Sequence, residues 1–552
     1  MKELQQIQRL FPSEDGNEDS QRHFLSLIEM LVKNIDSLKN PAQTMLGELK
    51  EKSDDYYESI IKNSETPSKG IALEEVVDTL VSLSEGHPYQ TRNYVTNAIP
   101  MASIPGLLGS LTASLLNSNG LWDVYGPAAA EAEIKVVTMM SKLVGYDEKS
   151  SSGYTTWGGQ GAVFTSLRLA IAKQFPHAKE EGIPNNLYCF ASENAHYSLL
   201  KSVEATGIGS SHLITVKANP HNHAMDLQDL HDKMEQVIVQ GGIPIYIAAT
   251  TGATDSFGID DVKGMKEIAD QLTEKYSLNS VYIHADSAMG GMYCVFNEYD
   301  FEQNPLSFEE EVKQGLMQIR EKMKYLHVAD SVCFDFHKLG QTPYISNLIV
   351  TKNGEDFKLL DLQECETPYV GNRGYGNYHT SYTLECSRMG SAISIYAALL
   401  AFGIEGYQQI LANYVRVNHT FRNKLLANFS NVAVTNNHNP GPATAFRFYK
   451  GLPKWEEECE GRMSLKEINE TNKWNSLIFE QIGAERDKVF FGDTTRHCLV
   501  DVVDKEEVSP ISVVKFFSIS PYTTVETIDT FIHFLHEQIK QVEDNEGVLS
   551  GV

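Results

Sequence analysis

The sequence is poor in cysteine, in basic residues and in long apolar runs. Its seven cysteines lie far apart and form no CxxC pair, so it offers neither a disulfide framework nor a zinc knuckle. With 46 Lys and Arg against 73 Asp and Glu, the formal net charge is −27, which argues against a nucleic-acid partner or an anionic membrane surface. The apolar stretch at 392–404 is shorter than the ~20 residues of a membrane-spanning helix. The first twenty residues contain no apolar signal-peptide core, so we expect a cytoplasmic protein.

What is present in the middle of the chain is an alternation of short apolar runs with helix-like segments. Runs of six to nine mostly apolar residues are typical of buried parallel strands. Their alternation with helices predicts an α/β fold, a mainly parallel sheet flanked by helices. The expected strands are 187–192, 243–251, 280–286 and 331–337, and the expected helices around them include 127–145, 162–175 and 260–276.

The two ends of the chain follow other patterns. Residues 1–86 are polar, with apolar residues at helical spacing, and predict a helical N-terminal segment. We expect a large domain over 87–400 and a smaller α+β domain over 401–552. Further expected elements are helices at 24–35, 71–83 and 523–543 and strands at 443–450 and 510–520.

Polar residues that end the strand-like runs are the candidate functional residues, because ligands of an open parallel sheet bind at the carboxyl ends of its strands. Each has a purely structural alternative, such as a glycine turn, a helix cap or an exposed lysine. Together they favour a site. The segments are GGQGA (158–162), AHYS (195–198), TTGATDS (250–256), HADSAMGG (284–291) and FHK (336–338).

One ligand, pyridoxal 5'-phosphate (PLP), would use all five segments. It needs a lysine for its aldehyde, an acid for its ring nitrogen, a flat group for its ring face and a helix start for its phosphate. Lys338, Asp286 and His196 match the first three needs, and the turn Gly159–Gly161 matches the fourth. Thr254 could add a hydroxyl to the phosphate.

At these residues the chain resembles the group II PLP-dependent amino-acid decarboxylases, which have the type I fold with a seven-stranded sheet. The matching segments appear in family order between about residues 87 and 540, and include DFHKLGQTPY, SYTLECSRMGSA and ISPYTTVETID. The resemblance makes Lys338 the residue that binds the cofactor's aldehyde and Asp286 the partner of its ring nitrogen. His196 would stack on the ring, with Ala288 beneath it. Gly159, Gln160, Gly161, Thr254 and His337 would be the further cofactor-binding residues.

The resemblance also implies a mobile loop whose tyrosine supplies the proton that replaces carbon dioxide. Tyr369 is the first choice because of its distance along the chain from Lys338 and Arg388, and Tyr375 and Tyr378 are the alternatives. Arg388 matches the arginine that follows this loop and would bind substrate. The predicted catalytic residues are therefore Lys338, His196, Tyr369 and His337.

The sequence departs from the family pattern around the cofactor's phosphate. Gln160 stands where Ser or Thr is usual, and Asp335 stands near a usual Asn. Ala253, Ser287 and Phe336 replace a common Thr, Ala and Pro respectively. Weakened phosphate binding is one expected consequence. None of the replacements removes a predicted catalytic group.

The resemblance therefore predicts PLP-dependent decarboxylation of an L-amino acid. The sequence motifs are most similar to those of the bacterial tyrosine decarboxylases, so an aromatic amino acid is the first choice of substrate. Glutamate, aspartate and diaminobutyrate remain as alternatives. Family members are homodimers, which we expect here. The alternatives are an aminotransferase or lyase of the same fold, an inactive relative that binds cofactor, and a metal- or nucleotide-binding module using His284, Asp286 and His337.

Overall fold

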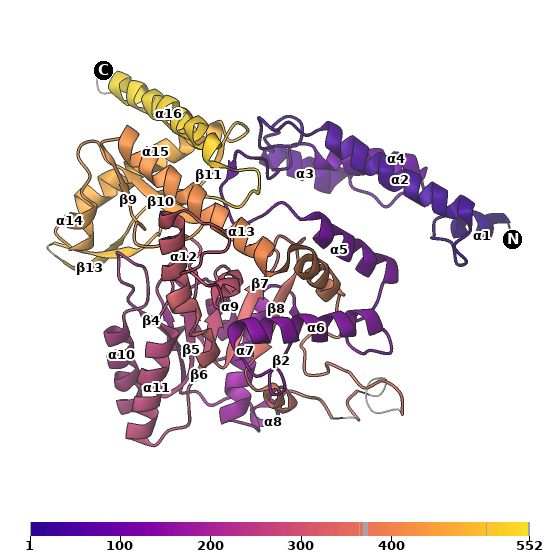
Figure 1. The fold of residues 1–552 in the computed structure, drawn as a ribbon, viewed down its shortest axis with the longest axis horizontal. Helices are drawn as coiled ribbons and strands as arrows, with labels where there is room; N and C mark the ends of the chain where they lie inside the picture. Colours follow the sequence, from indigo (N-terminus) through magenta and orange to yellow (C-terminus); the bar gives the residue numbers. More distant parts are fainter. Residues whose placement is uncertain (1, 364, 368–373, 504, 550–552) are drawn as a thin grey trace. The chain divides into compact units, whose positions relative to one another are not determined.

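A computed structural model of the chain describes residues 2–363, 365–367, 374–503 and 505–549 (Figure 1). The contacts within the chain divide it into two compact units. The first contains the residues up to Tyr94 together with Ala484–Phe490, and the second contains Val95–Gly483 together with the residues from Phe491 onward. Among the described residues, no helix combines the length and apolar character required to cross a bilayer.

The first unit is helical, as its polar sequence with spaced apolar residues predicts. Helix α2 begins after Asn17, whose side chain accepts a hydrogen bond from the amide of Ser20, and α3 begins after Ser53, which accepts one from Tyr56. Such caps satisfy amides that the first turn leaves without partners. The helices are α1 (Lys2–Gln8), α2 (Glu18–Ser37), α3 (Asp54–Asn63) and α4 (Leu73–Ser84).

A seven-stranded sheet forms the centre of the second unit, in the order β2-β8-β7-β6-β5-β3-β4. Strand β8 runs antiparallel to both of its neighbours, β2 and β7, and the other pairings are parallel. The mainly parallel sheet flanked by helices is therefore confirmed. The strands are β2 (Ser152–Thr156), β3 (Leu187–Ser192), β4 (Leu213–Val216), β5 (Ile243–Thr250), β6 (Tyr282–Asp286), β7 (Ser331–Asp335) and β8 (Asn347–Thr351).

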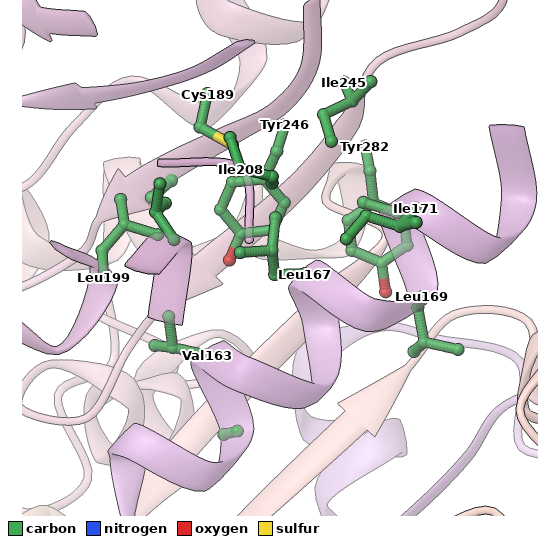
Figure 2. Close-up of a cluster of buried hydrophobic side chains, with 14 of the residues drawn as sticks. Val163, Leu167, Leu169, Ile171, Cys189, Leu199, Ile208, Ile245, Tyr246 and Tyr282 are labelled. Atoms are coloured by element: carbon green, nitrogen blue, oxygen red, sulfur yellow. The ribbon is translucent and has the colours of Figure 1, made fainter. Parts of the chain in front are cut away.

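Helix α7 packs against this sheet and buries one of its apolar clusters. Figure 2 shows Leu167 and Ile171 of α7 pointing toward Tyr246 of β5 and Tyr282 of β6, and all four side chains are buried. Burial of each large side chain contributes about 1.5–3 kcal/mol, so the cluster fixes α7 against the sheet. The main helices of the large domain are α5 (Ile104–Leu116), α6 (Pro127–Val144), α7 (Gly159–Gln174), α9 (Ser198–Ala205), α10 (Leu227–Val239), α11 (Val262–Tyr276) and α12 (Glu310–Met323).

The remaining part of the second unit has a smaller antiparallel sheet with helices. Helix α13 (Ser391–Asn428) leads into it and includes a non-helical residue, Gly403, at φ 59°. The predicted domain boundary at 400/401 falls inside this helix. The strands β11 (Phe490–Thr494), β14 (Val513–Phe517), β10 (Ala443–Phe448) and β9 (Val432–Val434) follow one another in that order, β12 (Leu499–Val502) pairs with β13 (Lys505–Pro510), and the helices are α14 (Trp455–Cys459), α15 (Leu465–Ala484) and α16 (Ile528–Leu549).

Candidate active site

The ends of separate strands meet around one cavity of about 230 Å³. Most of the predicted cofactor-binding residues line it, although they are up to 179 positions apart in the sequence, from Gly159 to Lys338 (338 − 159). A larger hollow of about 750 Å³, lined by Asn222, His438 and Glu456 among others, contains none of them. The smaller cavity is lined by Gly159, Gln160, Asn194, His196, Ser198, Thr250, Gly252, Thr254, Asp286, Ala288, Met289, Asp335, His337, Lys338 and Tyr344.

Lys338 lies in the loop that follows β7 and pairs with the last residue of that strand. Its Nζ is 2.9 Å from Oδ2 of Asp335, and the lysine side chain is 20% exposed. Burial lowers the pKa of Lys338, but the carboxylates of Asp335 and Asp286 outweigh burial and raise the pKa above its usual value. The amine is thus held in the cavity in its charged form.

Asp286 ends β6, the neighbouring strand, and retains an available carboxylate. Its Oδ1 accepts hydrogen bonds from the amide of Ala288 at 3.3 Å and from Sγ of Cys333 at 3.4 Å. Within the described part of the chain, no Lys, Arg or His nitrogen lies within 4 Å of it. Asp286 is half-buried. A carboxylate partly removed from water is stabilised by a cationic or proton-donating partner, and Asp286 faces the cavity, where a ligand can supply one.

The start of α7 closes another side of the cavity. Gly158, which precedes the helix, has φ 113°, a conformation that favours glycine, and a Cβ on Gly161 would lie 2.8 Å from Trp157. The amides of Gly159 and Gln160 donate no hydrogen bond to any described residue. Free amides at a helix start bind anions. The side chain of Gln160 is engaged elsewhere, since its Nε2 donates to the carbonyl of Ser198 at 3.0 Å and to Oγ of Ser202 at 2.7 Å.

Two histidines line the cavity as neutral rings. Burial lowers the pKa of His196, and its ring centre lies 4.2 Å from that of Tyr197. Burial also lowers the pKa of His337, whose Nδ1 donates to the carbonyl of Ser346 at 2.8 Å. A neutral imidazole offers both a flat face for stacking and a nitrogen for hydrogen bonding.

The predicted loop residues lie apart from this cavity or outside the described chain. Tyr369 falls outside the described residues. Tyr375 is 62% exposed and stacks on Trp122, while the hydroxyl of Tyr378 donates to Glu133 at 2.7 Å. Arg388 is buried in an ion pair with Glu133 and is absent from the cavity lining. Its assignment to substrate, and the choice among the tyrosines, remain predictions.

Several lining residues were not singled out from the sequence. Asn194 and Ser198 flank His196, and Tyr344 ends the segment DFHKLGQTPY, so only their nearness to predicted residues could have indicated them. Tyr344 is notable because its ring centre lies 4.2 Å from that of His337. Asp335 had been noted only as a departure from the family pattern, yet it is the ion-pair partner of Lys338.

The donor set of the cavity fits PLP better than a metal ion. It offers an amine for the aldehyde, an available carboxylate for the ring nitrogen, a flat ring for the ring face and free helix-start amides for the phosphate. His284, the alternative metal ligand, is fully buried, and its Nδ1 contacts Oγ of Ser331 at 2.8 Å. The described residues contain no group of three His, Cys, Asp or Glu side chains arranged for a metal ion.

The chain matches the family model described as the pyridoxal-dependent decarboxylase conserved domain over residues 66–303 and 316–448. A similar protein is the L-2,4-diaminobutyrate decarboxylase of Acinetobacter baumannii, 24% identical over 64% of this chain and 67% of that protein. Another is the aspartate 1-decarboxylase of Aliivibrio fischeri, 26% identical over 63% of this chain and 62% of that protein.

The fold is also that of solved decarboxylase structures. The glutamate decarboxylase domain of a diaminobutyrate-pyruvate transaminase and L-2,4-diaminobutyrate decarboxylase from Vibrio parahaemolyticus superposes with a TM-score of 0.73 at 17% identity, covering 98% of this chain and 99% of that one. Catharanthus roseus tryptophan decarboxylase gives a TM-score of 0.69 at 15% identity, covering 96% and 99%. At these identities the likeness establishes the fold.

Proposed function

The chain belongs to the pyridoxal-dependent decarboxylase family and is a PLP-dependent carboxy-lyase, and from this premise we propose that the cavity around Lys338 decarboxylates an L-amino acid. The observation that carries the proposal is the meeting of Lys338, Asp286, His196 and the free α7 amides around a single cavity. When bound, PLP supplies an electron sink for the pair left behind by carbon dioxide.

The residues of the cavity have distinct roles in this proposal. Lys338 holds the cofactor and gives way to the substrate's amine. Asp286 holds a proton at the ring nitrogen, which strengthens the electron sink through a charge placed in advance. His196, which lines the cavity, would stack on the ring face and restrict its tilt, so that the bond to the carboxylate could be oriented for cleavage. The amides of Gly159 and Gln160 bind the phosphate.

Protonation of the substrate's Cα requires a further acid. Tyr369 is our first choice, with Tyr375 and Tyr378 as alternatives. The engagement of Tyr378 with buried Glu133 disfavours it, because its hydroxyl already has an acceptor. Conversion of Tyr369 to Phe should therefore lower kcat at least about 100-fold, a typical contribution of a positioned acid, while Tyr378→Phe should leave kcat within about threefold.

The assignment of Lys338 is tested by its replacement. Lys338→Ala should lose the visible absorption band that PLP gives when joined to a lysine, and should release no carbon dioxide. Lys352→Ala, at an exposed position, is the matched control and should retain both. Persistence of the band in Lys338→Ala would refute the assignment. Product analysis separates decarboxylation from the competing aminotransferase reaction, which yields a keto acid.

The substrate class is best approached through the relatives. The two relatives matched by sequence are named for diaminobutyrate and aspartate, and these names favour an acidic or diamino substrate over the aromatic one predicted from the sequence motifs. The tryptophan decarboxylase is similar in fold at 15% identity, which says nothing about the substrate. Incubation with tyrosine, glutamate, aspartate and diaminobutyrate, followed by amine detection, distinguishes them. Formation of tyramine alone would restore the aromatic prediction.

We further propose that the protein is a cytoplasmic homodimer. Helix α5 packs one face on α13, where Gly109 lies against the backbone of Ser394 and the hydroxyl of Ser394 donates to the carbonyl of Gly106 at 2.8 Å. Its other face presents a row of exposed apolar side chains. An exposed row of this kind is typical of a protein interface. The row consists of Ile104, Leu107, Leu108, Leu111, Leu115 and Leu116. All seven cysteines are free thiols, which suits a reducing compartment.

A further inference from the structure

A buried carboxylate lies at the same end of the cavity as the start of α7. The nearest atom to a Cβ built on Gly159 is Oδ2 of Asp335, at 3.2 Å, and Oδ1 follows at 3.4 Å. Gly159 is the first residue of α7, whose free amides we assign to the cofactor's phosphate. Asp335 itself is 4% exposed. The site proposed for an anion therefore already contains one from the protein.

The carboxylate of Asp335 is held firmly in this place. Asn347 of β8 donates to its Oδ1, His337 Nε2 lies 3.4 Å from Oδ2, and Lys338 Nζ lies 2.9 Å from Oδ2. Despite burial, which raises it, the pKa of Asp335 is lowered by Lys338, His337 and Asn347. The group is thus ionised in the protein without cofactor.

Its charge balance changes when the cofactor is joined to Lys338. Joined to the cofactor, Lys338 would no longer present a free ammonium to Asp335, while the phosphate would bring further negative charge to the same region. His337 is the remaining nearby cation candidate. Burial lowers its pKa and Asp335 raises it, and even as an imidazolium it would balance the carboxylate alone and not the phosphate as well. Like charges a few ångströms apart in a partly buried site repel strongly, because little water is present to screen them.

We propose that Asp335 is a specificity-determining residue for the cofactor: its carboxylate opposes the phosphate at the start of α7 and reduces the preference of this protein for PLP over phosphate-free pyridoxal. The inference rests on the proposed function, because it places the phosphate of PLP at Gly159 and Gln160. Gln160 adds to the effect, since its side-chain amide nitrogen is used by Ser198 and Ser202.

The test is the ratio of the dissociation constants of PLP and pyridoxal, measured by absorption titration of the full-length protein. Asp335→Asn keeps the size of the side chain and removes its charge, and should raise the preference for PLP by about tenfold or more. The ratio cancels any effect of the lost Lys338 partner that acts on both compounds. Asp356→Asn, which changes a buried carboxylate that also pairs with a lysine, Lys173, but lies outside the cavity, should leave the ratio unchanged.

The possible results distinguish a failure of the inference about Asp335 from a failure of the proposed function. An unchanged or lower ratio in Asp335→Asn overturns the inference alone. If neither compound gives a band that Lys338→Ala abolishes, the proposed function fails and the inference fails with it. The native protein provides a test that needs no folded variant: a preference for PLP of about a hundredfold or less supports the inference, and a larger one overturns it.

Discussion

Arg388 and Glu133 form an ion pair in the interior of the protein, with side chains only 3% and 4% exposed. Glu133 belongs to α6 and also accepts hydrogen bonds from the amide of Thr155 at 2.8 Å and from the hydroxyl of Tyr378 at 2.7 Å. One carboxylate therefore ties the segment 378–388 to α6 and to β2. The segment has its own apolar contacts, but this pair is its charged attachment.

Removal of one partner of this pair should be strongly destabilising, because the other charge stays buried without compensation. Arg388→Met is expected to lower the free energy of unfolding by about 3–5 kcal/mol, measured by urea denaturation. The matched control is Lys358→Met, which breaks a pair with Glu355 whose side chains are both 70% exposed, and should have no measurable effect. A loss for Arg388→Met no larger than that of the control would contradict the prediction.

Stability should fall in mild acid because of two buried histidines. His223 and His497 have ring centres 4.4 Å apart and contact the carbonyl and hydroxyl of Thr435 respectively. Burial lowers the pKa of His223 to about 4 and lowers that of His497 well below its usual value.

Because the two pKa values are lowered in the folded protein, its stability should decrease as the pH falls. Above about pH 6.5 the histidines are neutral in both the folded and the unfolded chain, so their contribution is fully present. Between pH 6.5 and 4 only the unfolded chain takes up the protons, and stability decreases as pH falls. Urea midpoints at pH 7 and pH 5 measure the loss, and His223→Phe should make it smaller. An equal loss in the variant would exclude His223 as a source.

The packing of α5 on α13 should not tolerate a methyl group at Gly109. A Cβ there would lie 2.5 Å from Cα of Ser394, which is backbone and cannot move aside. Gly109→Ala is expected to lower the free energy of unfolding by about 1–3 kcal/mol. Gly483→Ala in α15 is the matched control, since a Cβ there meets no atom within 4 Å. Thermal unfolding of the two variants distinguishes steric overlap from a general effect of alanine.

The exposed face of the same helix predicts the assembly state. Leu108→Asp places a charge in the proposed interface without touching the glycine face, and should convert dimers to monomers in light scattering. Leu452→Asp, at an apolar side chain that is 79% exposed and outside α5, should leave the mass unchanged. A native protein that is already monomeric would overturn the dimer proposal.

Much of the fold follows from local patterns in the sequence. The run 187–192 coincides with β3, and 127–145 with α6, because short apolar runs and a Pro127 start are local signals. Strand β8 was not predicted. It follows the Lys338 loop and runs antiparallel, so the alternation of strands and helices, which indicates parallel neighbours, gives no sign of it.

The candidate site was likewise predictable from the sequence only in part. Asp286 ends an apolar run, and Lys338 and His196 follow the ends of two others, so their meeting could be predicted from the rule for parallel sheets. The pairing of Asp335 with Lys338 and the engagement of Gln160 with α9 depend on side-chain directions that sequence patterns do not contain. The burial of Arg388 depends likewise on Glu133, which is 255 positions away (388 − 133).

The antiparallel course of β8 has a consequence for the durability of the reactive amine. The segment bearing Lys338 leaves the sheet through β7 and returns to it through the adjacent β8, so both of its ends are clamped by one ladder of interstrand hydrogen bonds. Moving this segment away from the cavity would require breaking that ladder. We therefore expect the visible absorption of bound vitamin B6 to be lost together with the sheet structure during denaturation. The absorption band would then report on the unfolding of the whole sheet.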